Sequence, residues 1–234
     1  MESDWSNSGL EPTTNSELAE AWDDLVSGRA RVVAAYATRS RHFLELVDCD
    51  CDRDRDRTRC ALDSRAVTVL DQILSGAQQK VIAAETKRAT STVSGTAQRA
   101  MRALGLEANV SRFPMLLKVM YRAWQALRPT RARGHAPNVG MPRIVNIFRP
   151  DACLQQRLSP SEYEVARDLV DGLRQEQIAR RRHTAKRTVA NQVANVYQKL
   201  GVSGRNELMA WLAAQTSDLL VEQRPTRELH SARS

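Results

Sequence analysis

The sequence has little of what several protein classes need. Aromatic residues make up only 5% of the chain, which suits small helical units better than β-sandwiches or barrels. No run of eighteen apolar residues is present, so no membrane-spanning helix is predicted, and the acidic start Met1–Asp4 is unlike a signal peptide. The four histidines are scattered, and neither a nucleophile motif nor a glycine-rich phosphate loop accompanies them. We therefore expect a cytoplasmic protein that is not an enzyme and needs no cofactor.

Cysteine is also scarce, at four residues: Cys49, Cys51, Cys60 and Cys153. The Cys-x-Cys pair and Cys60 offer three zinc ligands, but their spacing is not that of a zinc finger and no histidine lies close by. Reduced, unligated thiols are the favoured interpretation, and no metal site is predicted.

Positive charge is in excess but unevenly placed. The net charge is +8, whereas residues 1–60 contain 13 acidic and 8 basic residues, so the remainder of the chain carries +13. This distribution indicates a polyanionic partner for the later part of the chain, either nucleic acid or a membrane surface.

The segment 186–200 predicts an amphipathic helix. Its apolar residues recur at spacings of four, three and four: Val189, Val193, Val196 and Leu200. The opposite face carries amide and cationic groups and no carboxylate: Arg187, Asn191, Ala194, Asn195 and Gln198. Asn, Gln and Arg can form bidentate hydrogen bonds with base edges in the major groove. The alternative is an ordinary solvated helix face.

Two further helices precede this one. Ser159, Pro160 and Glu162 predict a capping box with proline in the first turn, and Gly172 predicts the end of that helix. A short helix over 175–182 and a turn at 183–185 follow. Short helix, turn and longer helix make a helix-turn-helix, which favours DNA as the partner of the basic region.

This region resembles the LuxR-type DNA-binding domain over about fifty residues. The resemblance rests on Leu-Ser-Pro-x-Glu-x-Glu-Val from Leu158, Gly172, Ile178-Ala179, Thr188-Val189, Lys199-Leu200-Gly201-Val202 and Arg205-x-Glu207-Leu208. It implies a fourth helix, Gly204 to Gln215, which in that family often forms a dimer contact. The chain departs from the family at Arg182-His183, where Leu-Gly is usual, and at Gln192, where His is common. The predicted DNA-binding residues are Lys186, Arg187, Thr188, Asn191, Gln192, Asn195, Lys199 and Arg205.

The same pattern recurs 96 positions earlier as an internal repeat. The repeated positions are Leu62, Val69, Gly76, Ile82-Ala83, Thr92-Val93 and Leu104-Gly105. Its third helix is predicted over 90–104, with Val93, Ala97, Ala100 and Leu104 inward, and its last helix over 111–127. The predicted DNA-binding residues of this first, degenerate copy are Ser91, Thr92, Ser94, Gln98, Arg99 and Arg102. The alternative is a decayed copy that keeps only the scaffold.

The predicted fold is mainly α: two tandem four-helix helix-turn-helix domains, each preceded by a short β segment. Near the start, a helix capped by Thr14 and ended by Gly28 leads to two β runs, 31–37 and 42–47, that pair as a hairpin. The predicted organisation is a disordered start (1–13), helix and hairpin (14–47), an Asp/Arg-rich linker (48–60), the first copy (61–127), a Pro/Gly linker (128–142), a short β segment (143–157), the second copy (158–216) and a tail (217–234).

These features predict a bacterial, sequence-specific DNA-binding transcriptional regulator. About fifteen flexible linker residues reach roughly 20 Å, and successive major grooves lie about 34 Å apart, so the two copies can act as a tethered intrachain pseudo-dimer. The expected partners are double-stranded DNA, RNA polymerase and a second copy of the chain through the fourth helices, with no membrane. The alternative is a module that uses helix-turn-helix scaffolds to bind RNA polymerase or another regulator.

Overall fold

The computed structural model describes residues 10–38, 40–49, 61–106, 115–127 and 142–222. The predictions for Cys51 and Cys60, for the linkers over 50–60 and 128–141, for residues 111–114 and for both chain ends lie outside the described residues. The described part is mainly helical with one small sheet, as the sequence predicts. Within it, no helix is long and apolar enough to cross a membrane.

The first helix and a hairpin begin the fold. The helix α1 (Asn15–Val26) starts with the predicted capping box, in which the Glu17 N–H donates to Thr14 Oγ1 at 3.4 Å and the Thr14 N–H donates to Glu17 Oε2 at 2.9 Å. It ends before Gly28, whose φ of +74° lets the chain turn into the sheet. The strands β1 (Ala30–Ala37) and β2 (Arg41–Asp48) then pair antiparallel, as predicted for the hairpin.

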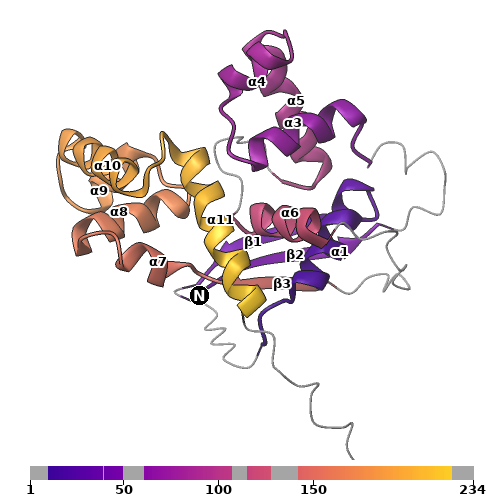
Figure 1. The fold of residues 1–234 in the computed structure, drawn as a ribbon, viewed down its shortest axis with the longest axis horizontal. Helices are drawn as coiled ribbons and strands as arrows, with labels where there is room; N and C mark the ends of the chain where they lie inside the picture. The colour runs from indigo at the N-terminus through magenta and orange to yellow at the C-terminus, as the bar shows by residue number, and fades with distance from the viewer. Residues whose placement is uncertain (1–9, 39, 50–60, 107–114, 128–141, 223–234) are drawn as a thin grey trace, which may run out of the picture.

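The third strand joins this hairpin. The strand β3 (Arg143–Phe148) pairs antiparallel with β2, giving the order β1-β2-β3. The β segments predicted before residues 61 and 158 are therefore both present. They form one sheet, because a lone strand satisfies its backbone hydrogen bonds only on a neighbouring strand. In Figure 1, α1 and α6 (Met115–Leu127) lie over one face of the sheet, and that face buries Val32, Leu44, Leu46, Val145 and Ile147.

Residues 10–13, predicted as part of a disordered start, run beside β3. The Thr13 N–H donates to the Asn146 carbonyl at 3.0 Å, and Asn146 Nδ2 donates to the Glu11 carbonyl at 3.1 Å. Asn146 is buried, so its amide needs these partners. No local pattern in the sequence predicts this long-range contact.

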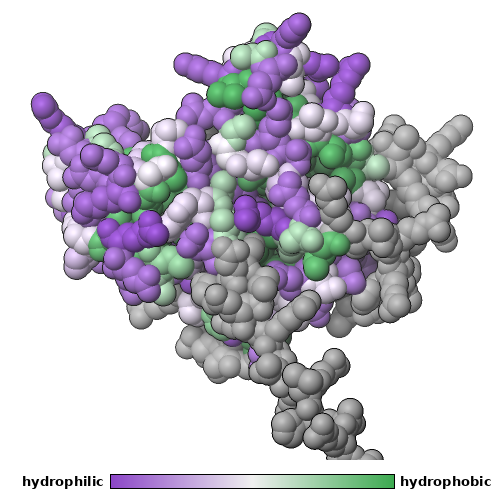
Figure 2. All heavy atoms as spheres, viewed as in Figure 1, coloured by the Kyte–Doolittle hydropathy of each residue, from purple (hydrophilic) through white to green (hydrophobic). Residues whose placement is uncertain are grey.

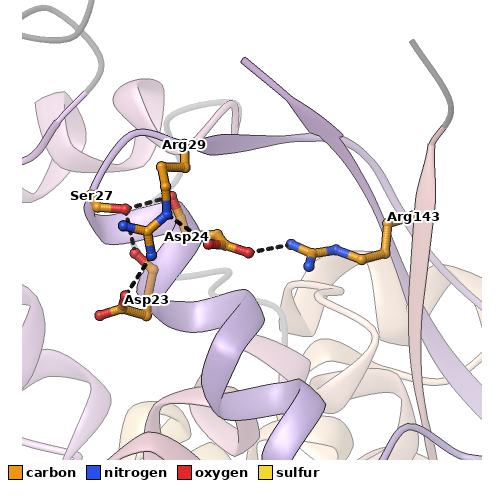
Figure 3. Close-up of polar contacts among 5 residues, drawn as sticks. All are labelled: Asp23, Asp24, Ser27, Arg29 and Arg143. Carbon is orange, nitrogen blue, oxygen red and sulfur yellow. Dashed lines mark hydrogen bonds and ion pairs between the residues drawn. The ribbon is translucent and has the colours of Figure 1, made fainter. Parts of the chain in front are cut away.

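An ion-pair cluster ties α1 to the first and third strands (Figure 3). Asp24 Oδ1 pairs with Arg29 Nε and Asp24 Oδ2 pairs with Arg143 Nη2, each at 2.8 Å. Arg29 also pairs with Asp23 at 2.5 Å. Asp24 is mostly buried, so this cluster fixes the start of β3 against the end of α1.

The remaining helices form two three-helix units and their connections. The first unit is α3 (Ser64–Leu74), α4 (Gln79–Glu85) and α5 (Thr90–Ala103). The second is α8 (Pro160–Val170), α9 (Gln175–Arg181) and α10 (Lys186–Leu200), with α7 (Asp151–Gln155) before it and α11 (Arg205–Glu222) after it.

Two of these elements correct the predicted boundaries. The short helix α7 occupies part of the segment predicted as β or turn, 143–157. The helix α11 continues to Glu222, whereas the predicted helix ended at Gln215 and the tail began at 217. No Gly or Pro occurs between Arg205 and Pro225, so no residue in that stretch ends the helix.

The two units repeat their backbone geometry at the offset of 96. Thr86 N–H donates to Ile82 O, and Arg182 N–H donates to Ile178 O, both at 2.9 Å. The next residues, Lys87 and His183, adopt positive φ of 52° and 51°. The glycines predicted as stops also match, since Gly76 and Gly172 have φ of 107° and 95°. The two turns before the third helices therefore have the same backbone conformation.

Candidate nucleic-acid interface

The helix α10 buries the stripe that the sequence predicts. Val189 and Val196 are fully buried, and Val193 and Leu200 nearly so. These residues pack on α8 and α9 and leave the opposite side of the helix to solvent. The rotation of α10 about its own axis is therefore the predicted one.

The solvent side of α10 carries the residues best suited to base recognition. Arg187, Thr188, Asn191 and Asn195 are exposed, and none of their side chains has a hydrogen-bond or ion-pair partner among the described residues. Figure 2 shows this lobe of the molecule, where α9 and α10 lie, as mostly hydrophilic surface. No Asp or Glu lies on α10, so a phosphate backbone can approach without repulsion from this helix.

The start of α10 is open. Ala185 occupies the N-cap and provides no side-chain hydrogen bond, so the first N–H groups of the helix lack a side-chain partner. Lys186 lies beside them and pairs with Glu176 at 2.5 Å, with both side chains more than half exposed. An exposed pair of this kind is worth about 0–1 kcal/mol and exchanges readily for a phosphate.

Three predicted DNA-binding residues are instead held by the fold. Gln192 Nε2 donates to Ser161 Oγ at 2.7 Å, and Lys199 Nζ pairs with Glu162 Oε2 at 2.7 Å. Arg205 donates to backbone carbonyls of the second unit. These side chains join α10 and α11 to α8, and the structure gives each of them a structural role.

Glu162 is the centre of one of these contacts. Its carboxylate accepts hydrogen bonds from Lys199 and from the N–H and hydroxyl of Ser159. These bonds, with that from Lys199 the largest cause, hold the pKa of Glu162 at about 2 instead of its usual 4.5. The charged carboxylate therefore links the start of α8 to the end of α10.

The departures from the LuxR pattern in the turn are accommodated locally. Arg182 is only 17% exposed, and its guanidinium pairs with Glu164 at 2.8 Å and donates to Ser161 Oγ at 3.1 Å. Its stem is buried while its charged head reaches two partners. His183 takes the left-handed conformation for which glycine is usual, at a cost of about 1 kcal/mol.

In the first unit, α5 presents a smaller polar face. Ser91, Thr92, Arg99 and Arg102 are exposed, whereas Ser94 and Gln98 are half-buried. The structure also buries Thr96 and Met101, which the predicted inward set omitted. Leu104, which follows α5, also meets β1, where the Val32 N–H donates to the Leu104 carbonyl at 2.8 Å.

The start of α11 contacts both three-helix units through adjacent residues. Arg205 donates to the carbonyls of Leu169 and Leu173, while Asn206 Nδ2 donates to the carbonyls of Ile73 and Ala77 at 3.0 and 2.9 Å. Leu169 and Leu173 are the positions 96 residues after Ile73 and Ala77. One helix therefore supplies the carbonyl ends of α3 and α8 with equivalent hydrogen bonds.

A buried lysine provides further hydrogen bonds to the carbonyl end of α3. Lys118, on α6, is 0% exposed, and its Nζ donates to Ile73 O at 2.9 Å and to Leu74 O at 3.1 Å. Burial lowers the pKa of Lys118 to about 7. The only sequence signal is a lysine inside the apolar run Met115–Tyr121, and no role was predicted for it.

These contacts change the expected relation between the two units. The helix α6 packs along α1 and α11, and Arg149 of the β3–α7 connection pairs with Asp171 at 2.8 Å and donates to Thr38 O at 3.3 Å. The units are thus joined by packed helices (Figure 1) and by hydrogen bonds and ion pairs. The expectation that only a flexible linker relates them is wrong.

Within the described part of the chain, no three His, Cys, Asp or Glu residues lie close enough together to hold a metal ion. Neither Cys49 nor Cys153 forms a disulfide among the described residues. The other two cysteines, Cys51 and Cys60, lie outside the described residues.

Comparison with known families places the second unit. Residues 156–212 match the family described as "Bacterial regulatory proteins, luxR family". No curated protein and no solved structure matches the chain. The matched residues cover α8, α9, α10 and the first part of α11. Residues 156–212 are therefore a LuxR-type helix-turn-helix domain, the domain of DNA-binding transcription regulators.

Proposed function

We propose that the protein is a sequence-specific transcription regulator that reads DNA in the major groove with α10. The observation that carries this proposal is the exposed face of α10, where the side chains of Arg187, Asn191 and Asn195 have no partner among the described residues, within a LuxR-type domain. Asn191 and Asn195 lie one helical turn apart, so both amides reach the same groove.

The α10 residues divide into two roles by their chemistry. Asn191 and Asn195 can each donate to and accept from an adenine edge, which discriminates between base pairs by about 1–3 kcal/mol per good bidentate contact. Arg187 and Lys186 lie in the first turn, beside the open helix N-terminus, where a backbone phosphate is favoured. Base contact by the amides gives specificity, and phosphate contact by the first turn gives affinity.

The first unit supplies a second DNA contact in this proposal. Its support is the repeated turn geometry and the basic, hydroxyl-bearing face of α5. The equivalent contacts of Arg205 and Asn206 and the packing of α6 on α11 support an intrachain pseudo-dimer. In this arrangement α6 and α11, the last helices of the two copies, pack against each other within one chain. This intrachain contact takes the place of the contact that the sequence predicts between the fourth helices of two separate chains. The half-sites differ because the faces of α5 and α10 differ.

The test combines selection of bound fragments from random DNA with affinity measurements on the preferred site. Asn191→Ala should cost about 1–3 kcal/mol on that site and relax preference at one base pair. Arg187→Ala should weaken binding to all DNA sequences alike and reduce the slope of log affinity against log salt by about one. Arg122→Ala, which removes an exposed charge from α6, is the matched control and should change neither quantity.

The outcomes also separate the protein-interaction alternative. Affinity for DNA that survives the triple change of Arg187, Asn191 and Asn195 to Ala contradicts the role of α10. A chain whose DNA affinity is absent or insensitive to salt would instead favour a module that binds RNA polymerase or another regulator, because counterion release accompanies phosphate contacts.

A further inference from the structure

A cavity lies between α1, α3 and α6, on the far side of the first unit from its turn. Its volume is about 90 Å³, and its walls include three aromatic rings, Trp22, Tyr121 and Trp124, over aliphatic side chains. Two carboxylates, Asp23 and Asp71, also line it. Drug-sized ligands occupy pockets of roughly 300–1,000 Å³, so this cavity admits only a head group of a few heavy atoms.

Two of the aromatic rings are buried and form a fixed wall of the cavity, and the third ring is more accessible. Trp22 and Tyr121 are 4% and 2% exposed and meet edge to face, with ring centroids 5.6 Å apart. Trp124 stacks on Tyr121 at 6.3 Å and is half-buried. The hydroxyl of Tyr121 accepts from Gln125 Nε2 at 2.5 Å, which fixes the ring orientation. The negative faces of such rings attract a cation.

The two carboxylates differ in their partners. Asp23 pairs with Arg29 at 2.5 Å, so its charge is largely neutralised. The carboxylate of Asp71 has no hydrogen bond or ion pair with any described residue. Asp71 is exposed, and its partial burial raises its pKa above the usual value. A carboxylate beside aromatic rings repels an anionic ligand and attracts a cationic one.

We propose that this cavity binds a small organic cation, an alkyl- or quaternary ammonium head group, between the rings of Trp22, Tyr121 and Trp124 and the carboxylate of Asp71. The rings provide cation–π attraction and Asp71 provides the countercharge. The site is independent of the DNA-reading face of α10. Because α3 and α6 also contact α11, the bound cation lies against helices that hold the two units together.

The experiment is calorimetric titration of the full chain with choline and with 3,3-dimethyl-1-butanol, its neutral isostere of the same shape. Butylammonium and 1-butanol form a second pair. At least one cation should bind ten times more tightly than its neutral counterpart. Asp71→Asn should weaken that cation's binding about five- to tenfold, and Trp124→Leu, which keeps apolar volume without a ring, at least tenfold.

Glu85→Gln, an exposed carboxylate change on α4, is the control and should bind like the wild type. Melting temperatures of all variants establish that they are folded. If Trp124→Leu does not fold, the binding affinity of Asp71→Asn still tests the proposal, because Asp71 is exposed. The proposal is overturned when neither cation binds up to about 10 mM, when the neutral isosteres bind as tightly, or when Asp71→Asn leaves affinity unchanged.

Discussion

Lys118 couples stability to pH at a single buried side chain. It caps the carbonyls of Ile73 and Leu74 at the end of α3 while lying in a helix that packs on two others. A hydrogen-bonded but unpaired amine in such a place is disfavoured in its charged form. The folded protein therefore releases the Lys118 proton near pH 7, far below the pH at which the unfolded chain does.

This depressed pKa predicts stability that rises with pH. Between about pH 7 and 10.5 the unfolded chain binds more protons than the folded one, so the free energy of unfolding increases across this range, by up to a few kcal/mol. Lys118→Met keeps the volume and removes the titrating group, so the rise should largely disappear. Urea unfolding at pH 7, 8, 9 and 10 measures the free energy of unfolding of the wild type and of Lys118→Met. Equal pH slopes for the two would contradict the assignment.

Side chains such as Lys118, Asn206 and Asn146 mark what the sequence could not predict. Each makes its contacts with residues more than a hundred positions away, or about 45 away for Lys118, and no local pattern encodes those partners. By contrast, the capping boxes at Thr14 and Ser159 involve residues three positions apart and were predicted correctly.

Among the helices, α10 was predicted best because its apolar residues are periodic and a glycine marks its carboxy-terminal end. The spacing of Val189, Val193, Val196 and Leu200 determined its buried side, and Gly201 ends it with φ of 68°. The sheet and α7 were predicted incompletely, because strand pairing depends on long-range register and α7 spans only five residues.

The helix phase of α10 can be tested with two aspartates on opposite faces. Val196 is fully buried between α10 and the helices beneath it, so Val196→Asp places an unpaired carboxylate in the core and should destabilise the second unit by several kcal/mol. Ala194→Asp, on the exposed face, should leave the melting transition nearly unchanged but weaken DNA binding by adding negative charge to the reading surface. Circular dichroism melting measures the stability of each variant, and DNA titration measures its affinity for DNA. Unfolding by Ala194→Asp with tolerance of Val196→Asp would mean that the assigned phase is wrong.

At the scale of the whole molecule, the sequence predicted two units with matching turns but did not predict the joint between them. The offset of 96 residues predicted matching turns, and the structure has them at Lys87 and His183. Composition predicted only a Pro/Gly linker between the copies. The sheet pairing of β3 with β2, the packing of α6 on α11 and the contacts of Asn206 instead join the two parts of the chain through folded structure.

A cut in the linker distinguishes this folded joint from a flexible tether. A specific protease site inserted between Arg133 and Gly134 divides the chain into a part ending in α6 and a part beginning with β3. With a folded joint, the two fragments should elute together from a size-exclusion column, and their affinity for the preferred DNA site should change less than about threefold. A tether alone acts through effective concentration, so cutting it should lower affinity tenfold or more. Uncut protein with the same insertion is the control. Separation of the fragments after cleavage, together with weakened binding by each, would show that the linker, not the interface of α6, α11 and the sheet, holds the two parts of the chain together.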